Sequence, residues 1–546
     1  MSRFDTMRAM FRLALLIQAL FACLLASAQN PQQTADILFI HARLLDGAGN
    51  PWRYADVAVK GDRISFVGDS EKAGIRASET LDLGGKLYLA PGFIDTHTHT
   101  FRGLSTPEMK ENLNYLMEGV TTVVSGNDGG SPWPIAATLE SWDKNGIGTN
   151  AALFVGFGTV RQQVLGMADR APTADELKRE QDLIRQGMRE GAFGMSTGLF
   201  YVPQSFSKTD EVIALAKVGA EMGGIYDSHL RDEDSYSIGV KGAVAEAIEI
   251  GRQAHLPIMI SHIKVLGKAV WSQAPQIVAM IDTARREGIN VVTNQYPYEA
   301  SGTAFEAAVL PNWAAEGGRE KMLERFHDPQ QRARLLKEVP ELIEKRGGPA
   351  SLVLIGYRPD PSLRGKSLEQ IAQQWNIAPA EAVLRLLEKG STSVVSHNMT
   401  ESDIAEFMKQ DWTATGSDGE SALPGQLSHP RSWGTFAVKL QKYVEQQHVI
   451  TLPFAIRAAT SLPAEIMGLN DRGLIRAGYF ADLIIFDLAR VNSSSTYTDP
   501  AHYAQGFEDV LVNGKFAVRN GQPTHVLAGR ALRGPATATT LRAQAQ

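Results

Sequence analysis

Short apolar runs alternate with amphipathic stretches through most of the chain. Eight of the runs have the length and composition of strands: 87–90, 121–125, 152–155, 193–196, 224–227, 257–261, 290–293 and 412–415. Stretches between them carry helix signals, such as the capping-box spacing of Thr173 and Glu176. Leu177, Ile184 and Met188 then fall on one face of that helix. Strands that alternate with helices predict a parallel sheet, and eight such units close an α/β fold, the (β/α)8 TIM-type barrel.

The two ends of the chain show a different, purely β pattern. Val57 and Val59 alternate with polar neighbours, and 481–487 is a compact apolar run. Residues 510–518 form a predicted hairpin around an Asn-Gly turn. We therefore expect one small β-sheet domain built from both ends, residues 29–90 and 474–546, around a barrel at 91–473.

Many more residues separate the seventh and eighth predicted strands than one crossover helix and its loops need. This gap contains two polar helical stretches, 319–346 and 367–388. The first of them predicts a helical insertion at about 299–350, between barrel strands 7 and 8, placed as a cap over the barrel mouth.

The first 28 residues have the organisation of a secretory signal peptide. Three arginines precede the apolar run 13–25, and Ala26-Ser27-Ala28 supplies small residues for cleavage. We expect a periplasmic or secreted protein, with an uncleaved anchor or a lipoprotein at Cys23 as alternatives. Cys23 is the only cysteine of the chain, so the mature protein would have neither disulfides nor thiolate metal ligands.

Length, composition and net charge limit the fold size and the binding partners that we expect. The chain has 546 residues, enough for a large barrel with additions, and 44% of them are hydrophobic. Its formal net charge is -6, which gives no reason to expect a nucleic-acid partner, nor a membrane partner beyond export.

Candidate chemistry lies at the carboxyl ends of the predicted strands, where barrel enzymes place their working residues. His97 and His99 are two residues apart, so on extended backbone both imidazoles leave the same face. Any one of these polar residues could serve structure alone, but four histidines with two carboxylates predict a site for one or two divalent metal ions. The ends of the strands contribute His97, His99, Asp128, His229, His262 and Asp418. His397 and His429 fit neither a surface position nor this site clearly.

The sequence resembles the amidohydrolase superfamily, and within it the N-acyl-D-amino-acid deacylases, or D-aminoacylases. Matching stretches extend from about residue 36 to 533: 91–99, 119–124, 191–199, 260–264, 296–298, 416–419, 429–431 and 478–483.

The resemblance implies a mechanism. A divalent ion, Zn2+ in this family, lowers the pKa of a bound water for attack on the amide of an N-acyl-D-amino acid, which releases a carboxylate and a D-amino acid. Asp418 would accept the water proton and pass it to the amine. The family's substrate-binding residues correspond to Lys264, Tyr296 and Arg431. Arg431 suits an α-carboxylate because its planar fork can bind both oxygens, and a structural salt bridge is its alternative role.

Two positions depart from the family. Asp128 stands where the family has a cysteine ligand, and its oxygen donors favour harder metal ions than a thiolate does. Gly302, beside Ser301, stands where the family often has a serine, so one substrate contact is expected to be shifted or missing.

Two other functions compete with deacylation. A related amidohydrolase could act on a dipeptide or cyclic amide, but no lysine at the end of the fourth strand is placed for the carboxylated-lysine bridge that marks many of those enzymes. A non-catalytic binder of acyl amino acids would be expected to lose metal ligands or Asp418, and both are present.

Overall fold

The centre of the molecule is a barrel of parallel strands, seen in the computed structural model, which describes residues 34–537. Strands β6, β7 and β8 pair in that order, and β9, β10, β11, β12, β13 and β17 continue the series. Two backbone hydrogen bonds close the ring, from Asp418 N–H to His97 O (2.9 Å) and from His99 N–H to Gly419 O (2.7 Å). If β8 and β9 are taken as one interrupted strand, the described residues contribute eight barrel strands, which confirms the predicted fold: β6 (Phe93–Asp95), β7 (Val120–Ser125), β8 (Asn150–Leu153) with β9 (Val155–Gly156), β10 (Gly194–Gly198), β11 (Ile225–His229), β12 (Ile258–Ile260), β13 (Val291–Gln295) and β17 (Thr413–Thr415).

The position of the first barrel strand was predicted wrongly. The apolar run 87–90 forms β5 (Tyr88–Pro91), which pairs with strands of the β-sheet domain and not with the barrel. Gly92 N–H still donates to Asp482 O of that sheet (2.8 Å), whereas Phe93 N–H donates to Gly119 O beside the barrel (2.9 Å). A Cβ on Gly92 would lie 2.2 Å from Thr121 Oγ1, so only glycine fits this crossing.

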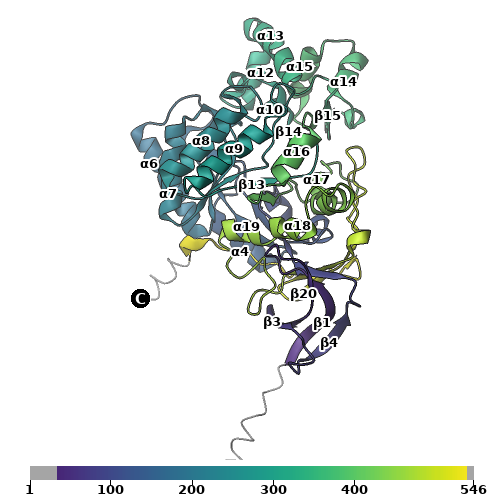
Figure 1. The fold of residues 1–546 in the computed structure, drawn as a ribbon. Helices are drawn as coiled ribbons and strands as arrows, with labels where there is room; N and C mark the ends of the chain where they lie inside the picture. The colour runs from purple at the N-terminus through teal and green to yellow at the C-terminus, as the bar shows by residue number, and fades with distance from the viewer. Residues whose placement is uncertain (1–33, 538–546) are drawn as a thin grey trace, which may run out of the picture.

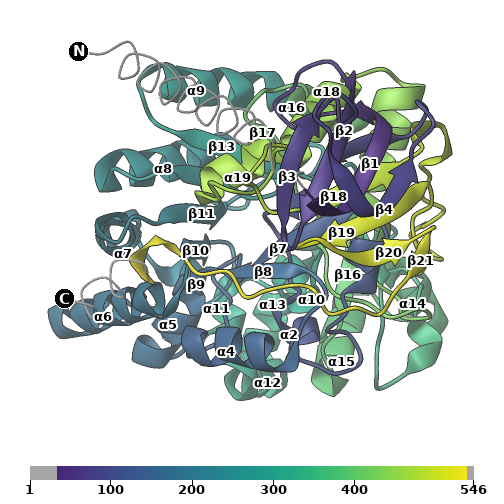
Figure 2. The same ribbon diagram turned by 90° about the horizontal axis from the view of Figure 1, so that it is seen from below.

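The β-sheet domain combines both ends of the chain, as predicted (Figures 1 and 2). Asn513 and Gly514 have φ of 48° and 77°, which is the conformation that an Asn-Gly hairpin turn requires. In the described residues this sheet has nine strands: β1 (Thr34–Leu44), β2 (Arg53–Lys60), β3 (Arg63–Gly68), β4 (Arg76–Asp82), β5, β18 (Leu483–Phe486), β19 (Phe507–Val512), β20 (Lys515–Arg519) and β21 (Gln522–Pro523).

Helices surround the barrel and bury their apolar faces against it. In α6 the Thr173 hydroxyl accepts from Glu176 N–H and the Glu176 carboxylate accepts from Thr173 N–H, which confirms the predicted capping box. The main helices beside the strands are α4 (Ile135–Asn145), α5 (Phe157–Leu165), α6 (Ala174–Glu190), α7 (Thr209–Glu221), α8 (Gly239–Ala254), α9 (Ala274–Arg286), α16 (Glu401–Met408), α17 (Arg431–Val438), α18 (Leu452–Ala459) and α19 (Ser461–Met467).

The insertion, residues 300–397, stands at the opposite end of the barrel from the β-sheet domain (Figure 1). It has a hydrophobic core of its own, which includes Phe326, Leu335 and Leu384. Both helical stretches, 319–346 and 367–388, belong to it, so it continues well past residue 350. Its main elements are β14 (Ala300–Ala304), α10 (Phe305–Val309), α11 (Asn312–Ala315), α12 (Arg319–His327), α13 (Pro329–Lys345), β15 (Leu352–Leu354), α14 (Leu368–Trp375), α15 (Pro379–Lys389) and β16 (Ser393–His397).

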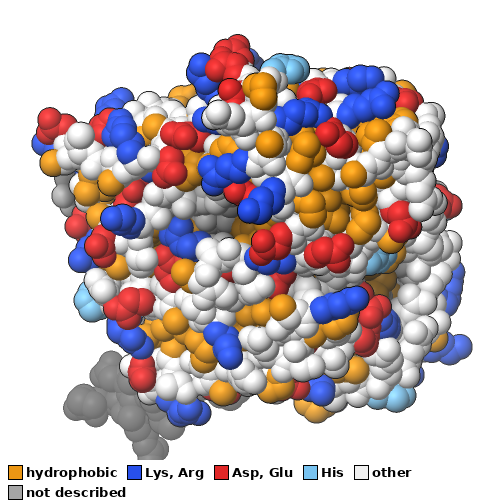
Figure 3. All heavy atoms as spheres, turned by 90° about the horizontal axis from the view of Figure 1, so that it is seen from above, with side chains coloured by type: hydrophobic (Ala, Val, Ile, Leu, Met, Phe, Trp, Pro, Cys, Tyr) orange, Lys and Arg blue, Asp and Glu red, His pale blue; other side chains and the backbone are white. Residues whose placement is uncertain are grey.

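The face seen from above, on the side of the insertion, mixes acidic, basic and apolar side chains (Figure 3). Within residues 34–537, no helix combines the length and the apolar character that a membrane span needs. The predicted signal peptide, residues 1–28, lies outside the described residues.

Candidate metal centre

Asp95, the last residue of β6, connects the two ends of the barrel ring. Its Oδ1 accepts from His97 N–H (3.0 Å), and both of its carboxylate oxygens accept from Ser417 N–H (3.1 Å each). Burial raises the pKa of Asp95 to about 7. Because these bonds join the end of β6 to the loop after β17, they place His97 beside Asp418. Asp95 was not predicted as a site residue, although it lies only two residues before His97.

Four of the predicted ligands meet at one point above the barrel. One ligand atom from each of His97, Asp128, His262 and Asp418 lies within 4.8 Å of all the others. His97 Nε2 is 3.4 Å from Asp128 Oδ1 and 3.6 Å from Asp418 Oδ1. His262 Nε2 lies 3.6 Å from Asp128 Oδ1. These spacings leave room for an ion between the side chains.

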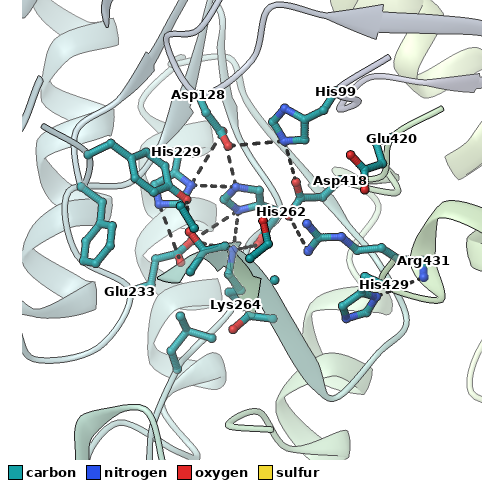
Figure 4. A pocket seen from close by; sticks show the side chains of 18 of the residues that line it. His99, Asp128, His229, Glu233, His262, Lys264, Asp418, Glu420, His429 and Arg431 are labelled. Carbon is teal, nitrogen blue, oxygen red and sulfur yellow. Dashed lines mark hydrogen bonds and ion pairs between the residues drawn. The ribbon is translucent and has the colours of Figure 1, made fainter. Parts of the chain in front are cut away.

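The other two predicted ligands lie on either side of this group (Figure 4). His99 Nε2 is 3.0 Å from Asp418 Oδ1. His229 Nδ1 is 2.9 Å from His262 Nε2, and its Nε2 is 3.9 Å from Glu233 Oε2. His229, Glu233 and His262 form a second group of potential ligands, so the structure brings all six predicted residues together and adds Glu233.

Two of the four histidines are in the neutral form that binds a metal ion, whereas the pKa of His262 rises to about 9, because burial is outweighed by Asp418 and Asp128. Burial lowers the pKa of His97 and of His229 to about 4, so both imidazoles are neutral at pH 7. Burial alone would raise the pKa of Asp128, but His97 and His229 outweigh it, and the pKa falls well below its ordinary value. Among the described residues, His97 Nδ1 and Nε2, Asp128 Oδ1 and His229 Nε2 are buried without a hydrogen-bond partner. Buried nitrogen and oxygen atoms that lack hydrogen-bond partners and lie in one cluster are suitable ligands for a divalent ion.

Three residues of the cluster hold a strained backbone. Asp128, His262 and Asp418 have φ of 56°, 33° and 52°, in the left-handed region that non-glycine residues rarely adopt. Neighbouring side chains stabilise two of them: Gln204 Nε2 donates to Asp128 O (2.9 Å), and Asn294 Oδ1 accepts from His262 N–H (2.5 Å). Strain of this kind is typical of functional sites, where the surrounding structure holds it in place.

Two cations lie beside the cluster, each with a carboxylate partner. Lys264 Nζ is 2.7 Å from Glu233 Oε1, and Arg431 Nη1 is 2.7 Å from Asp418 Oδ2. Burial raises the pKa of Asp418, but Arg431 more than offsets this together with nearby histidines, so the carboxyl is ionised and its pKa lies far below the ordinary value.

The third predicted substrate-binding residue, Tyr296, has a supporting position. Its ring lies 5.0 Å from the Arg431 guanidinium and 5.8 Å from Lys264 Nζ. The side chain is only 1% exposed and does not line the cavity, whereas Lys264 and Arg431 do.

The cavity above the cluster, of about 300 Å³, is lined by both the barrel and the insertion. Gly302 stands in its wall, where an added Cβ would lie 3.4 Å from Arg431 Nη2, and Ser301 Oγ is turned away to donate to Asn398 Oδ1 (3.2 Å). His429, undecided from sequence, is buried here and its Nδ1 accepts from Arg431 N–H (3.1 Å), whereas His397 is exposed. His429 therefore helps to position Arg431.

A parallel barrel with histidines and carboxylates gathered at its strand ends, joined to a sheet domain, defines the class of metal-dependent barrel hydrolases. Residues 79–518 match the model of the Amidohydrolase family. The chain belongs to that family.

Similarity to individual members is extensive. The chain is 32% identical to D-aminoacylase of Alcaligenes xylosoxydans xylosoxydans, over 92% of this chain and 99% of that protein. It is 31% identical to N-acyl-D-glutamate deacylase of the same organism, over 92% and 97% respectively. The structure of N-acyl-D-glutamate deacylase from Bordetella bronchiseptica, complexed with zinc and a phosphonate mimic of the tetrahedral intermediate, superposes with a TM-score of 0.77 at 28% identity and covers 92% of this chain and all of that one.

Proposed function

We propose that the protein hydrolyses the amide bond of N-acyl-D-amino acids and releases a carboxylate and a D-amino acid. One observation carries this proposal: Asp418 lies between the histidine cluster and Arg431, 3.0 Å from His99 Nε2 and 2.7 Å from Arg431 Nη1. A proton acceptor is thereby next to both a metal site and a cation that suits a carboxylate. The relatives named as deacylases support the same reaction.

One or two divalent ions, Zn2+ by analogy with the Bordetella relative, would be held by the six-residue cluster. When bound, such an ion supplies a Lewis acid that activates water at neutral pH and polarises the amide carbonyl. The holding residues are His97, His99, Asp128, His229, His262 and Asp418.

The side chains around the cluster perform the remaining steps. Asp418, kept ionised by Arg431, accepts a proton from the attacking water and passes it to the departing nitrogen. Arg431 Nε has no hydrogen-bond partner among the described residues, so this guanidinium still has a donor for the substrate α-carboxylate. Lys264, in the cavity wall, supplies a second positive charge near the carbonyl oxygen, and the Tyr296 ring lies beside both cations.

A panel assay tests the proposal. The purified protein is loaded with Zn2+, its metal content is measured, and turnover is compared on matched N-acyl-D-amino acids, N-acyl-L-amino acids, a dipeptide and a cyclic amide. We expect turnover of the D-series that rises with metal content. Hydrolysis confined to the L-series or to the cyclic amide would refute the assignment.

We also propose that the protein acts outside the cytoplasm, after removal of residues 1–28. The arginines before the apolar run 13–25, and the small residues at 26–28, support this placement.

A further inference from the structure

Arg346 is a buried cation that the metal centre does not use. It follows α13, and its backbone N–H donates to Ile343 O (3.2 Å), so the end of that helix fixes where its side chain begins. The residue is 3% exposed and lines the cavity above the metal cluster. It is the insertion, not the barrel, that supplies this guanidinium to the site.

The guanidinium of Arg346 has no anionic partner. In residues 34–537 it forms no ion pair or hydrogen bond, and its Nε is buried and unsatisfied. Its contacts are with two aromatic rings, Phe200 at 5.4 Å and Tyr236 at 5.5 Å. The other two cations of the cavity, Lys264 and Arg431, each have a carboxylate within 3 Å.

Neither acidic residue near Arg346 pairs with it directly. Glu233 is paired with Lys264, and Asp234 attracts Arg346 electrostatically but forms no ion pair with it and does not line the cavity. A buried guanidinium without a directly paired carboxylate is costly, because it has lost its water and gained no charged hydrogen bond in return. An anion that enters the cavity would remove this cost.

Arg346 and Arg431 lie toward different sides of the metal cluster. Arg346 lies over Phe200, whose ring is 6.1 Å from the His229 ring, whereas Arg431 pairs with Asp418. Figure 4 shows His229 on one side of His262 and Arg431 on the other. A substrate whose α-carboxylate is held by Arg431 therefore reaches Arg346 with a different part of the molecule.

We propose that Arg346 binds a second anionic group of the substrate, a carboxylate on either the D-amino-acid side chain or the acyl group. This inference rests on the proposed deacylase function and gives it a substrate class, N-acyl-D-amino acids with two carboxylates. Arg346 is then a specificity-determining residue, contributed by the insertion.

The test uses pairs of substrates that differ only by carboxylate and amide. N-acetyl-D-glutamate with N-acetyl-D-glutamine examines the side chain, and N-succinyl-D-leucine with its succinamoyl counterpart examines the acyl group. N-acetyl-D-leucine reports deacylation without either group. The zinc-loaded full chain is compared with Arg346→Met, which keeps bulk without charge, with Arg346→Lys, and with Lys345→Met, a neighbouring cation outside the cavity lining.

We expect the acid of one pair to be preferred, and Arg346→Met to lower kcat/KM on it about 10- to 100-fold relative to its amide, as loss of a charged hydrogen bond implies. Arg346→Lys should recover part of the preference, and Lys345→Met should not change it. The pair that responds identifies which carboxylate is bound. Acid-to-amide ratios that Arg346→Met leaves unchanged in both pairs, while N-acetyl-D-leucine is hydrolysed, would overturn this inference alone. If the zinc-loaded protein hydrolysed none of the five compounds, the deacylase function would be overturned, and this inference with it.

Discussion

Arg431 Nη1 lies 2.7 Å from Asp418 Oδ2, so the residue expected to bind the substrate carboxylate also touches the residue expected to move the proton. The sequence left two roles open for Arg431, a substrate clamp and a structural salt bridge. The structure shows an ion pair on one side of the guanidinium and an unpartnered Nε on the other. One guanidinium can pair with Asp418 and also bind the substrate carboxylate, because it has five N–H donors.

Replacement of Asp418 by Asn should preserve the fold and metal binding but remove proton transfer. Amide and carboxylate have nearly the same shape, and general acid–base catalysis typically contributes about 10²- to 10⁴-fold in rate. We expect kcat to fall by that factor in a protein whose metal content, measured by elemental analysis, equals that of the wild type. Glu420→Gln, in the same cavity but outside the cluster, is the matched control. Near-normal turnover of metal-loaded Asp418→Asn would remove Asp418 from the mechanism.

Replacement of Arg431 separates its two contacts. Arg431→Lys keeps the charge but gives up the paired geometry, so kcat/KM on N-acyl-D-amino acids should fall, and Arg431→Ala should lower it further. The comparison is with the corresponding N-acyl-D-amino-acid amides, which lack the α-carboxylate. A clamp predicts a loss of about 10-fold or more that is specific to the carboxylates. If kcat/KM fell equally on the carboxylates and on their amides, Arg431 would act only through its ion pair with Asp418.

Asp128 should be a metal ligand. Its Oδ1 lies within 3.7 Å of three histidines, so Asp128→Ala is expected to lower metal content and activity together. Asp128→Cys should retain metal and shift its preference from harder ions such as Mn2+ toward Zn2+, because a thiolate is the softer donor. Competition between the two metals, followed by elemental analysis, measures this. Unchanged stoichiometry and affinity in Asp128→Ala would show that Asp128 only fixes the glycine-rich turn.

Lys439 should make stability depend on pH. Burial lowers its pKa from 10.5 to about 7, and Nζ has Thr415 Oγ1 as hydrogen-bond acceptor (2.8 Å). Below pH 7 Lys439 is charged in both states, but it is buried in the folded protein and hydrated in the unfolded chain. The burial of this charge then lowers the free energy of unfolding by its full amount. Between pH 7 and 10.5 the folded lysine is neutral while the unfolded one still binds a proton, so stability rises with pH.

Lys439→Met should therefore raise the free energy of unfolding by roughly 2 to 4 kcal/mol at pH 6 and by much less near pH 10. Urea denaturation at the two pH values measures the difference, with the exposed Lys409→Met as control. A gain of equal size at both pH values would show that packing, not charge, explains the effect.

Export predicts a defined N-terminus. If Ala28 precedes the cleavage point, exported protein should begin at Gln29, which intact-mass measurement on the periplasmic or secreted fraction would show. A retained leader would favour a membrane anchor, and a lipid-modified Cys23 would favour a lipoprotein.

The metal cluster could be predicted from sequence because each ligand follows a strand that its apolar run makes visible. His229 and His262 directly end such runs, and the structure places both among the potential metal ligands. Glu233 had no comparable signal. It lies in an acidic loop that is typical of a solvated surface, and only the fold shows that it is 5% exposed. Its spacing of four residues from His229 was the available hint.

Arg346 and the first barrel strand could not be placed for related reasons. Arg346 directly follows an amphipathic helix, and its spacing of three residues from buried Ile343 places it near the apolar side, but only the packing of the insertion on the barrel shows that it lines the cavity. At the first strand, residues 88–91 and 93–95 are both apolar and short, and which of them pairs with β7 is a long-range choice. Two adjacent apolar runs of similar length do not by themselves show which one pairs with the barrel and which with the β-sheet domain.

The crossing at Gly92 limits how this enzyme can be truncated, and how its barrel can be grafted onto another domain. β5 pairs with β1 and β18, and only Gly92 separates it from β6, which leads to His97. A fragment cut at residue 91 would lose the partner strand that anchors the start of the first catalytic segment, and a graft of this barrel onto a foreign sheet would have to reproduce the same one-residue step. The barrel is therefore not a portable module, because β1 and β18, which lie more than four hundred residues apart in the sequence, both hold the strand that leads to the first histidines.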